Sequence, residues 1–329
     1  MIEVQNLTKH YGPVTAIRDV SFSVAPGEIV GFLGPNGAGK STTMRILSCF
    51  MPASTGTATV AGFDVFRDSM EVRRRIGYLP ESVPLYTEMR VASYLDFVAE
   101  VKGVGRAQRR SRVADVMERC RISDVQNRII GKLSKGYRQR VGLAQAIVSD
   151  PAVLILDEPT IGLDPQQITE IRALIKSLAG DHTVILTTHI LPEVSMVCSN
   201  VIIINRGSIV AHGPIDRLVE DFFPTARVHV QIAGPPAAVR DGLGQIPGVV
   251  GVHDEPGLDG APSYVVESAR GRDVRGEIFQ LAAQQRWELR ELRRAGMTLE
   301  EVFIRIVAGE ETTEEAAPAT VAAPAEAEA

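Results

Sequence analysis

The sequence has few of the residues that hold small secreted proteins together. Only three cysteines occur among 329 residues, at positions 49, 120 and 198. They are too widely spaced to resemble zinc-ligand pairs or a disulfide framework. We therefore expect free thiols in a reducing compartment, and a chain that is long enough to stabilise itself with an apolar core.

The sequence also lacks long apolar runs. The longest, such as residues 153–156 and 201–204, are far shorter than the roughly 20 residues that span a bilayer. The N-terminal segment MIEVQNLTKH has no basic stretch followed by an apolar one, so we expect no secretory signal. If the protein works at a membrane, another chain must cross that membrane.

An excess of positive charge is missing as well. The formal net charge is -5 and the isoelectric point is near 5.8, which disfavours nucleic acid or anionic lipid as the main partner. A local run of arginines is interpreted as the solvated face of a helix, and it comprises Arg106, Arg109, Arg110 and Arg112. We expect no nucleic-acid partner.

The chain divides into two parts with different sequence patterns. Up to about residue 222, short β-branched runs alternate with helical stretches, which is typical of an α/β domain with a largely parallel sheet. Between about 85 and 148 the apolar residues recur at helical spacing without a strand pattern, so this part is predicted to be a helical insertion. The predicted strands include the apolar, β-branched runs at residues 29–33, 153–156, 184–187 and 201–205.

After residue 224 the predicted order is strand, helix, strand, strand, helix, strand, as in a small α+β domain of the ferredoxin-like kind. This accessory domain is expected over residues 225–307, including a short last helix at 299–307. Residues 309–329 consist mainly of Ala, Glu, Pro and Thr and are expected to be disordered. The predicted strands and helices are residues 227–232, 237–245, 249–253, 263–268, 274–285 and 288–292.

A glycine-rich segment follows the predicted strand at residues 29–33 and fits the pattern GxxxxGK[ST]. Glycines there let several backbone N–H groups point into one concavity, where a phosphate also meets the N-terminus of the following helix. Lys40 would reach the β- and γ-phosphates, and the Ser41 hydroxyl would ligate Mg²⁺. The segment predicted to bind ATP comprises Gly34, Pro35, Asn36, Gly37, Ala38, Gly39, Lys40, Ser41 and Thr42.

A second element is the apolar strand AVLIL, which ends in Asp157 and Glu158. Ligands of open α/β sheets bind at the carboxyl ends of the strands. Asp157 suits the Mg²⁺ shell, and Glu158 can polarise an attacking water as a general base. The alternative is that the two acids cap the next helix. Beside the glycine-rich loop, the catalytic interpretation is favoured.

With these two elements placed, residues 2–218 resemble the ATP-binding cassette family. The family signature matches at residues 133–137, LSKGY, immediately before a helical stretch. Lys135 and Tyr137 depart from the commonest form, LSGGQ. Ser134 is expected to cap the helix and donate to a phosphate, while Gly136 allows close backbone approach.

The resemblance also implies three further site residues. Asp164, at the end of the sequence IGLD, matches the family's dimer-contact loop, and His189 matches its switch histidine near the γ-phosphate. Tyr11 matches the aromatic residue that stacks on adenine, and such stacking contributes roughly 1 to 3 kcal/mol per base in other systems. The place of the family's glutamine loop is held by Glu81, which is expected to act in catalysis and toward Mg²⁺ but lacks an amide donor.

The segments YLPE, LSKGYRQRVGLAQA and TLEEVF most resemble the corresponding segments of exporter-type cassettes of the ABC-2 group, including its gliding-motility and multidrug branches. The resemblance implies a cytoplasmic ATPase, bound peripherally to ABC-2 permease subunits through the groove between Glu81 and the helical insertion. It also implies a homodimer or paired cassette whose composite sites place Ser134 and Gly136 over the other subunit's ATP.

Two other function classes fit the sequence less well. Soluble relatives that act on ribosomes or DNA usually carry two cassettes in one chain or a long coiled coil, and neither is found in this sequence. A module that only holds ATP is disfavoured because Glu158 is present to activate water.

Overall fold

The computed structural model of the chain describes residues 1–188, 190–222, 225–255, 262–269, 272–295 and 298–314. The chain divides into two compact units, Met1–Ile215 and Asp216–Ala329. This division falls before residue 222, where the sequence predicts the end of the first domain, so the helix over Ile215–Phe222 belongs mainly to the second unit.

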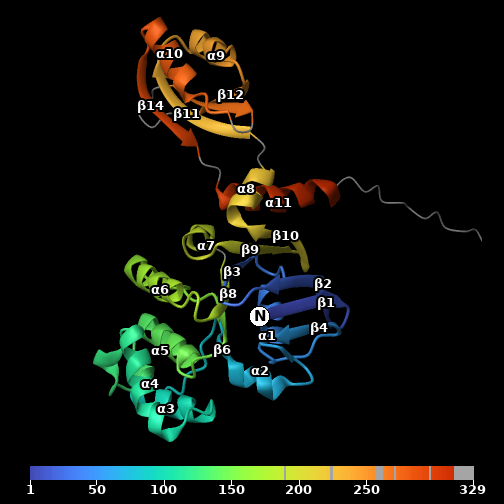
Figure 1. Cartoon of the computed structure of the whole chain (residues 1–329), viewed down its shortest axis with the longest axis vertical. Helices are drawn as coiled ribbons and strands as arrows, with labels where there is room; N and C mark the ends of the chain where they lie inside the picture. The colour runs from blue at the N-terminus through green and yellow to red at the C-terminus, as the bar shows by residue number, and fades with distance from the viewer. Residues whose placement is uncertain (189, 223–224, 256–261, 270–271, 296–297, 315–329) are drawn as a thin grey trace, which may run out of the picture. The chain divides into compact units, whose positions relative to one another are not determined.

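A six-stranded sheet forms the centre of the first unit (Figure 1), with the strand order β10-β9-β3-β8-β7-β6. The five strands from β9 to β6 are parallel to their neighbours, and β10 is an antiparallel edge strand. The predicted largely parallel sheet and its four strands are therefore confirmed. The strands are β3 (Ile29–Leu33), β6 (Ile76–Leu79), β7 (Val153–Asp157), β8 (Thr183–Thr188), β9 (Asn200–Asn205) and β10 (Ser208–Pro214).

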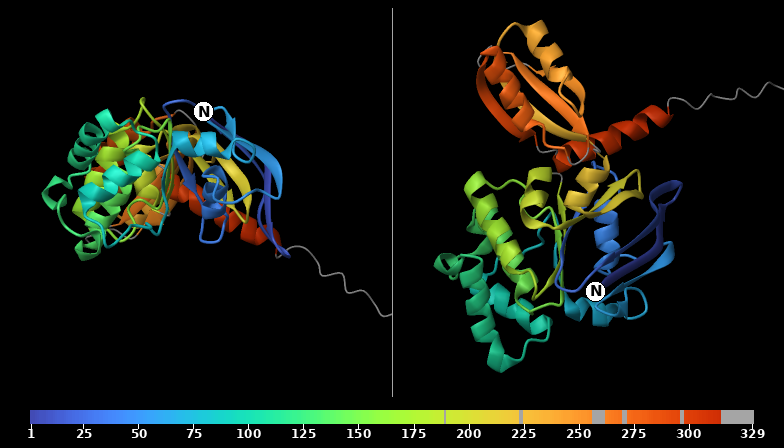
Figure 2. Two further views of the ribbon diagram at one scale, coloured as in Figure 1. Left: turned by 90° about the horizontal axis from the view of Figure 1, so that it is seen from below. Right: turned by 45° about the horizontal axis from the view of Figure 1, so that its top comes forward.

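Helices flank this sheet, and α1 (Lys40–Leu47) follows β3 directly. The segment predicted to be a helical insertion contains helices and no strand apart from an isolated bridge between Arg90 and Ile129. Figure 2 shows its three α-helices in green, grouped away from the blue N-terminal strands of the same unit. The remaining helices of the unit are α2 (Ser69–Arg75), α3 (Val91–Val101), α4 (Arg106–Arg119), α5 (Lys135–Ile147), α6 (Pro165–Ser177) and α7 (Leu191–Val197), with short 3-10 turns at Ser123–Val125 and Ile130–Lys132.

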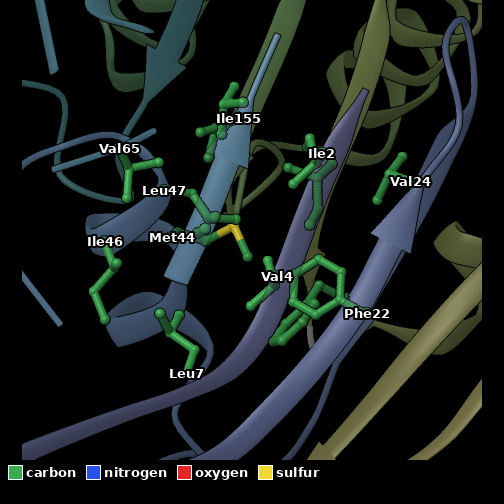
Figure 3. Close-up of a cluster of buried hydrophobic side chains, with 14 of the residues drawn as sticks. Ile2, Val4, Leu7, Phe22, Val24, Met44, Ile46, Leu47, Val65 and Ile155 are labelled. Carbon is green, nitrogen blue, oxygen red and sulfur yellow. The ribbon is translucent and has the colours of Figure 1, made fainter. Parts of the chain in front are cut away.

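A second, antiparallel sheet of the first unit has the order β2-β1-β4-β5. Apolar side chains from this sheet, from α1 and from the central sheet form one buried cluster, in which Val4, Phe22, Met44 and Ile155 lie close together (Figure 3). Burying each such side chain contributes about 1.5–3 kcal/mol. The cluster therefore fixes α1 and the loop before it against both sheets. The strands are β1 (Ile2–Tyr11), β2 (Val14–Val24), β4 (Thr55–Val60) and β5 (Phe63–Asp64).

The second unit contains an antiparallel sheet in the order β12-β13-β11-β14, with α9 and α10 packed on it and its own buried cluster around Val230 and Tyr264. The chain order of these elements is the one predicted. Helix α8 (Ile215–Phe222) precedes the sheet and lies beside α11 in Figure 1 and in the right view of Figure 2. The other elements are β11 (Thr225–Ala233), α9 (Pro236–Gly244), β12 (Val249–Glu255), β13 (Ser263–Ala269), α10 (Arg275–Gln285), β14 (Glu288–Ala295) and α11 (Leu299–Glu314).

The last helix is longer than the sequence predicts. α11 continues to Glu314, beyond Gly309, where disorder was expected to begin. Extending an existing helix adds one hydrogen bond per residue fixed, and the glutamates of this stretch have good helix propensity. The helix thus ends later than the predicted residue 307, and the expected disorder of the tail stays a prediction, since residues 315–329 lie outside the described residues. Among the described residues, no helix is both long and apolar enough to cross a bilayer.

Candidate nucleotide-binding site

The glycine-rich loop joins β3 to α1, as the sequence predicts. Gly39 is the N-cap residue of α1 and has a φ of 107°, a conformation that residues with a side chain rarely adopt. A Cβ atom on Gly39 would lie 2.5 Å from Ile17 Cγ2, and one on Gly34 would lie 2.3 Å from the carbonyl oxygen of Ile204. The loop can take this shape only with glycine at these positions, and its shape leaves the N-terminus of α1 open toward an anion.

Lys40 is the first residue of α1, and only 7% of it is exposed. Its ammonium donates to the carbonyl oxygens of Gly34 at 2.7 Å and Pro35 at 3.1 Å. Burial lowers the pKa of Lys40, whereas the carboxylates of Glu158 and, more weakly, Asp157 and Glu81 act to raise it. The ammonium is therefore held inside the loop and is surrounded by negative charge.

Asp157 lies at the carboxyl end of β7 and is buried. Its Oδ1 accepts a hydrogen bond from the Thr187 hydroxyl at 2.5 Å and lies 3.5 Å from the Ser41 hydroxyl oxygen. A carboxylate beside a serine hydroxyl is a set of hard oxygen ligands, which fits Mg²⁺ bound together with substrate phosphates. Among the described residues, no three His, Cys, Asp or Glu side chains form a metal cluster, so the phosphates would have to complete any such shell.

Glu158 follows Asp157 and has a φ of 50°, which is uncommon for a residue with a long side chain. Its backbone N–H donates to the Thr187 hydroxyl at 3.1 Å and to the Thr187 carbonyl oxygen at 3.2 Å. The alternative that Asp157 and Glu158 cap the next helix was wrong, because Asp164 is the N-cap residue of α6 and accepts from the Gln167 N–H at 2.9 Å. Glu158 therefore lies at the edge of the sheet, directly after β7, and not at the start of a helix.

These groups surround one open pocket of about 580 Å³. It brings the glycine-rich loop together with Glu81 from the loop after β6 and Glu158 from the loop after β7. The sequence predicted that these three distant segments contribute to one site. The lining residues are Asn36, Gly37, Gly39, Lys40, Ser41, Thr42, Glu81, Glu158 and Ile161.

Several predicted site residues lie elsewhere. Tyr11, at the end of β1, does not line this pocket; the residue is 43% exposed and its hydroxyl donates to Met51 Sδ at 3.0 Å. Ser134, Gly136 and Asp164 do not line it either. Gly34, Pro35 and Ala38 belong to the loop but do not line the pocket, and Asp157 contacts the Ser41 hydroxyl without lining it. His189 is outside the described residues, so its role stays a prediction.

The signature segment forms the start of α5. Ser134 is the N-cap residue and its hydroxyl accepts from the Tyr137 N–H at 3.4 Å, as the sequence predicts. Tyr137 is turned toward the helical region, since its hydroxyl donates to Asp124 Oδ2 at 2.8 Å. The helix N-terminus and Ser134 are therefore available to a phosphate that this chain's own pocket does not hold.

Sequence reasoning missed Thr187. Thr187 is fully buried, and its hydroxyl contacts both Asp157 and the backbone of Glu158, so it holds the two acids that the sequence predicts to carry the chemistry. A signal was present, because a threonine near the carboxyl end of the apolar strand TVILTT lies at the edge where ligands bind. Ile161, known from the sequence only as part of the contact loop, also lines the pocket.

The family profile described as "ABC transporter" matches residues 17–161. The chain is 37% identical over 209 residues to the ABC transporter ATP-binding protein NatA of Bacillus subtilis (strain 168), covering 63% of this chain and 85% of NatA. It is 34% identical over 311 residues to the Nod factor export ATP-binding protein I of Paraburkholderia xenovorans (strain LB400), covering 94% of this chain and 97% of that protein.

Among solved structures, the chain is similar to the ATP-binding cassette MJ0796, described as dimeric in a post-hydrolysis state bound to ADP and Pi. The TM-score is 0.61 at 25% identity, covering 65% of this chain and 98% of that chain. The pocket formed by the glycine-rich loop, Glu81 and Glu158 agrees with these similarities. The chain thus belongs to the ABC transporter family, in which it is an ATP-binding subunit with ATPase activity.

Proposed function

We propose that the protein works as a two-fold dimer in which each ATP is held between the pocket of one subunit and the signature segment of the other. The observation that carries this proposal is the separation, within one chain, of two phosphate-binding elements. Ser134 and the N-terminus of α5 are exposed to an incoming ligand but take no part in the pocket that contains Lys40 and Glu158. A second copy would complete both sites at once, as two-fold symmetry requires.

Within each composite site the residues have distinct roles. Lys40 and the N-terminus of α1 bind the β- and γ-phosphates, and Glu158 accepts a proton from the attacking water. Ser41 and Asp157 would hold Mg²⁺, with Glu81 in reach of the same region. Bound Mg²⁺ supplies positive charge that offsets the negative charge on the phosphate oxygens. Ser134 and Gly136 of the other subunit would cover the γ-phosphate.

Isolated mixed dimers test this arrangement. A Lys40→Ala subunit and a Ser134→Arg subunit, each with its own affinity tag, give one site with both defects and one site with neither. We expect such dimers to hydrolyse ATP at a measurable fraction of the normal rate, while each variant alone is inactive. The matched control places both substitutions on one chain paired with an unmodified chain, so that every site has one defect. Equal activity of the two mixed dimers would contradict the composite site.

We also propose that the dimer drives export through separate ABC-2-type permease subunits at the cytoplasmic face of the membrane. The name of the Nod factor export relative supports export. An aromatic cluster beside the Glu81 loop supports docking: Tyr86 lies 5.8 Å from Tyr94 and 5.6 Å from Phe97 between ring centroids. Tyr86 is 56% exposed and Phe97 39% exposed, so apolar surface is left open beside the helical region.

Permease docking is tested by co-purification. We expect Phe97→Asp to abolish recovery of the permease while ATP affinity stays normal, because the substitution places a charge in an apolar contact. Phe66→Asp is the control, since Phe66 is also an exposed aromatic residue, at 73%, but lies outside α3 and does not belong to the cluster. Undiminished recovery with Phe97→Asp would refute docking at this surface.

For residues 225–307 we propose a ferredoxin-like accessory domain, separate from an ATP-binding domain that ends near residue 222. The support is the chain order of strands and helices together with the sheet order β12-β13-β11-β14. The Nod factor export relative aligns over 311 residues, more than the first unit contains, so the similarity extends into this part.

A further inference from the structure

The nucleotide pocket has more negative than positive charge. Lys40 is the one cation among its described lining residues, whereas Glu81 and Glu158 both line it. Asp157 lies 3.5 Å from the Ser41 hydroxyl, and the charges of all three carboxylates act on the Lys40 ammonium. Bound ATP adds further negative charge. Bound Mg²⁺ would offset only part of this negative charge, because the phosphates and the three carboxylates together carry more charge than Mg²⁺ and Lys40 neutralise. A further cation from outside this pocket would therefore stabilise the closed site.

Lys135 is an exposed cation without a carboxylate partner among the described residues. It is the first residue of α5, next to Ser134, and therefore flanks the helix N-terminus that would receive the phosphate. Its ammonium lies against Gly162, because a Cβ atom added to Gly162 would be 2.0 Å from Lys135 Nζ. Gly162 adjoins Ile161, which lines the pocket. The ammonium thus lies on the same surface as the contact loop.

The segment that carries Lys135 is held in place from two sides. Gly136 is buried, and a Cβ atom on it would lie 2.2 Å from Gln167 Oε1, so the side chain of Gln167 packs directly on the segment. Tyr137 is bound to Asp124, and the Gln139 side chain donates to the Pro159 carbonyl oxygen at 3.0 Å. Lys135 therefore projects from a fixed base, which lowers the entropy that an ion pair must offset.

We propose that Lys135 of one subunit forms an ion pair with Glu81 of the other subunit across each ATP in the dimer. This inference rests on the dimer proposed above. Closure on the nucleotide removes water from both groups, and a carboxylate left there without a cation is costly. Close charge pairs across protein interfaces show coupling of tenfold or more in equilibrium constants. The Lys135 ammonium thus offsets the negative charge of the Glu81 carboxylate in the closed site.

The test uses two single variants, Lys135→Met and Glu81→Gln, mixed with a non-hydrolysable ATP analogue and Mg²⁺. Each homodimer would contain two unpaired charges. The mixed dimer would contain one intact ion pair and one site in which both charges are gone. Random mixing gives equal amounts of mixed dimers and homodimers, and we expect native mass spectrometry to show the ratio of mixed dimers to homodimers about tenfold above that value.

The control is Lys132→Met mixed with Glu81→Gln, because Lys132 is also exposed and lies just before the signature segment. This pair should mix randomly. If the unmodified chain dimerises with the analogue but Lys135→Met and Glu81→Gln also mix randomly, the ion pair is refuted and the dimer stands. If the unmodified chain stays monomeric at high concentration, the proposed function fails and this inference fails with it.

Discussion

Replacing Thr187 by valine tests whether the fold holds the two acids of the site in place. Valine has nearly the shape of threonine but no hydroxyl, so the change removes two hydrogen bonds with little change in packing. Asp157 loses a bond of 2.5 Å, and the Glu158 N–H loses one of 3.1 Å but keeps the Thr187 carbonyl at 3.2 Å. A bond to a buried charged group contributes about 1.5–3 kcal/mol, so we expect the free energy of unfolding to fall by about 2–3 kcal/mol.

The same change should slow ATP hydrolysis by about 10- to 100-fold, because misplacing a catalytic group costs rates of that order. Urea denaturation measures the loss of stability, and steady-state turnover at saturating ATP measures the rate. Thr183→Val is the matched control: Thr183 lies on the same strand, is buried and accepts one bond from the Gly27 N–H at 2.9 Å, far from the acids. It should cost stability without slowing hydrolysis. If both variants keep the normal turnover rate, Thr187 does not position the acids.

Three further predictions concern separate parts of the molecule. Lys40→Ala should abolish most nucleotide binding, whereas Glu158→Gln should keep binding and stop hydrolysis; equal loss of affinity in equilibrium titrations would refute these separate roles. Burial raises the pKa of Cys120 and Cys198 to about 12, from 9.0 for an unperturbed thiol, so the folded state binds more protons than the unfolded state above pH 9 and its stability should fall as the pH rises from 9 to 12. Replacing both thiols by alanine should make the measured alkaline loss shallower, and an unchanged slope would show that other groups cause it. Removing residues 315–329 should leave the melting temperature within about 1 °C of normal, because a composition of Ala, Glu, Pro and Thr offers little to bury; a large drop in a thermal melt would contradict this.

The sequence predicted the parts of the site that depend on contiguous residues. The glycine-rich loop could be recognised because the glycines, Lys40 and Ser41 act within a single turn between a strand and a helix. Asp157 and Glu158 could be assigned because a buried strand carries its last residues to a known edge of the sheet. Ser134 was correctly expected to cap α5, since N-capping depends on local backbone geometry.

The parts that depend on side-chain packing between distant segments could not be predicted. Nothing in the sequence indicates that Gln167 lies on Gly136 or that Lys135 lies against Gly162, because these contacts follow from how α5 and α6 pack. The end of α11 was missed for a different reason. Composition alone underestimates how far an established helix continues through residues such as glutamate.

The backbone of Glu158 places stability and activity in opposition at a single residue. A left-handed conformation costs a non-glycine residue on the order of 1–3 kcal/mol, and Glu158, with a φ of 50°, bears that strain at the edge of the sheet. Glycine would adopt the same conformation without strain but could not accept a proton from water. The fold alone would therefore favour a residue that cannot fill the proposed role of Glu158. A search for stabilising substitutions that ignored hydrolysis would select against the proposed general base itself.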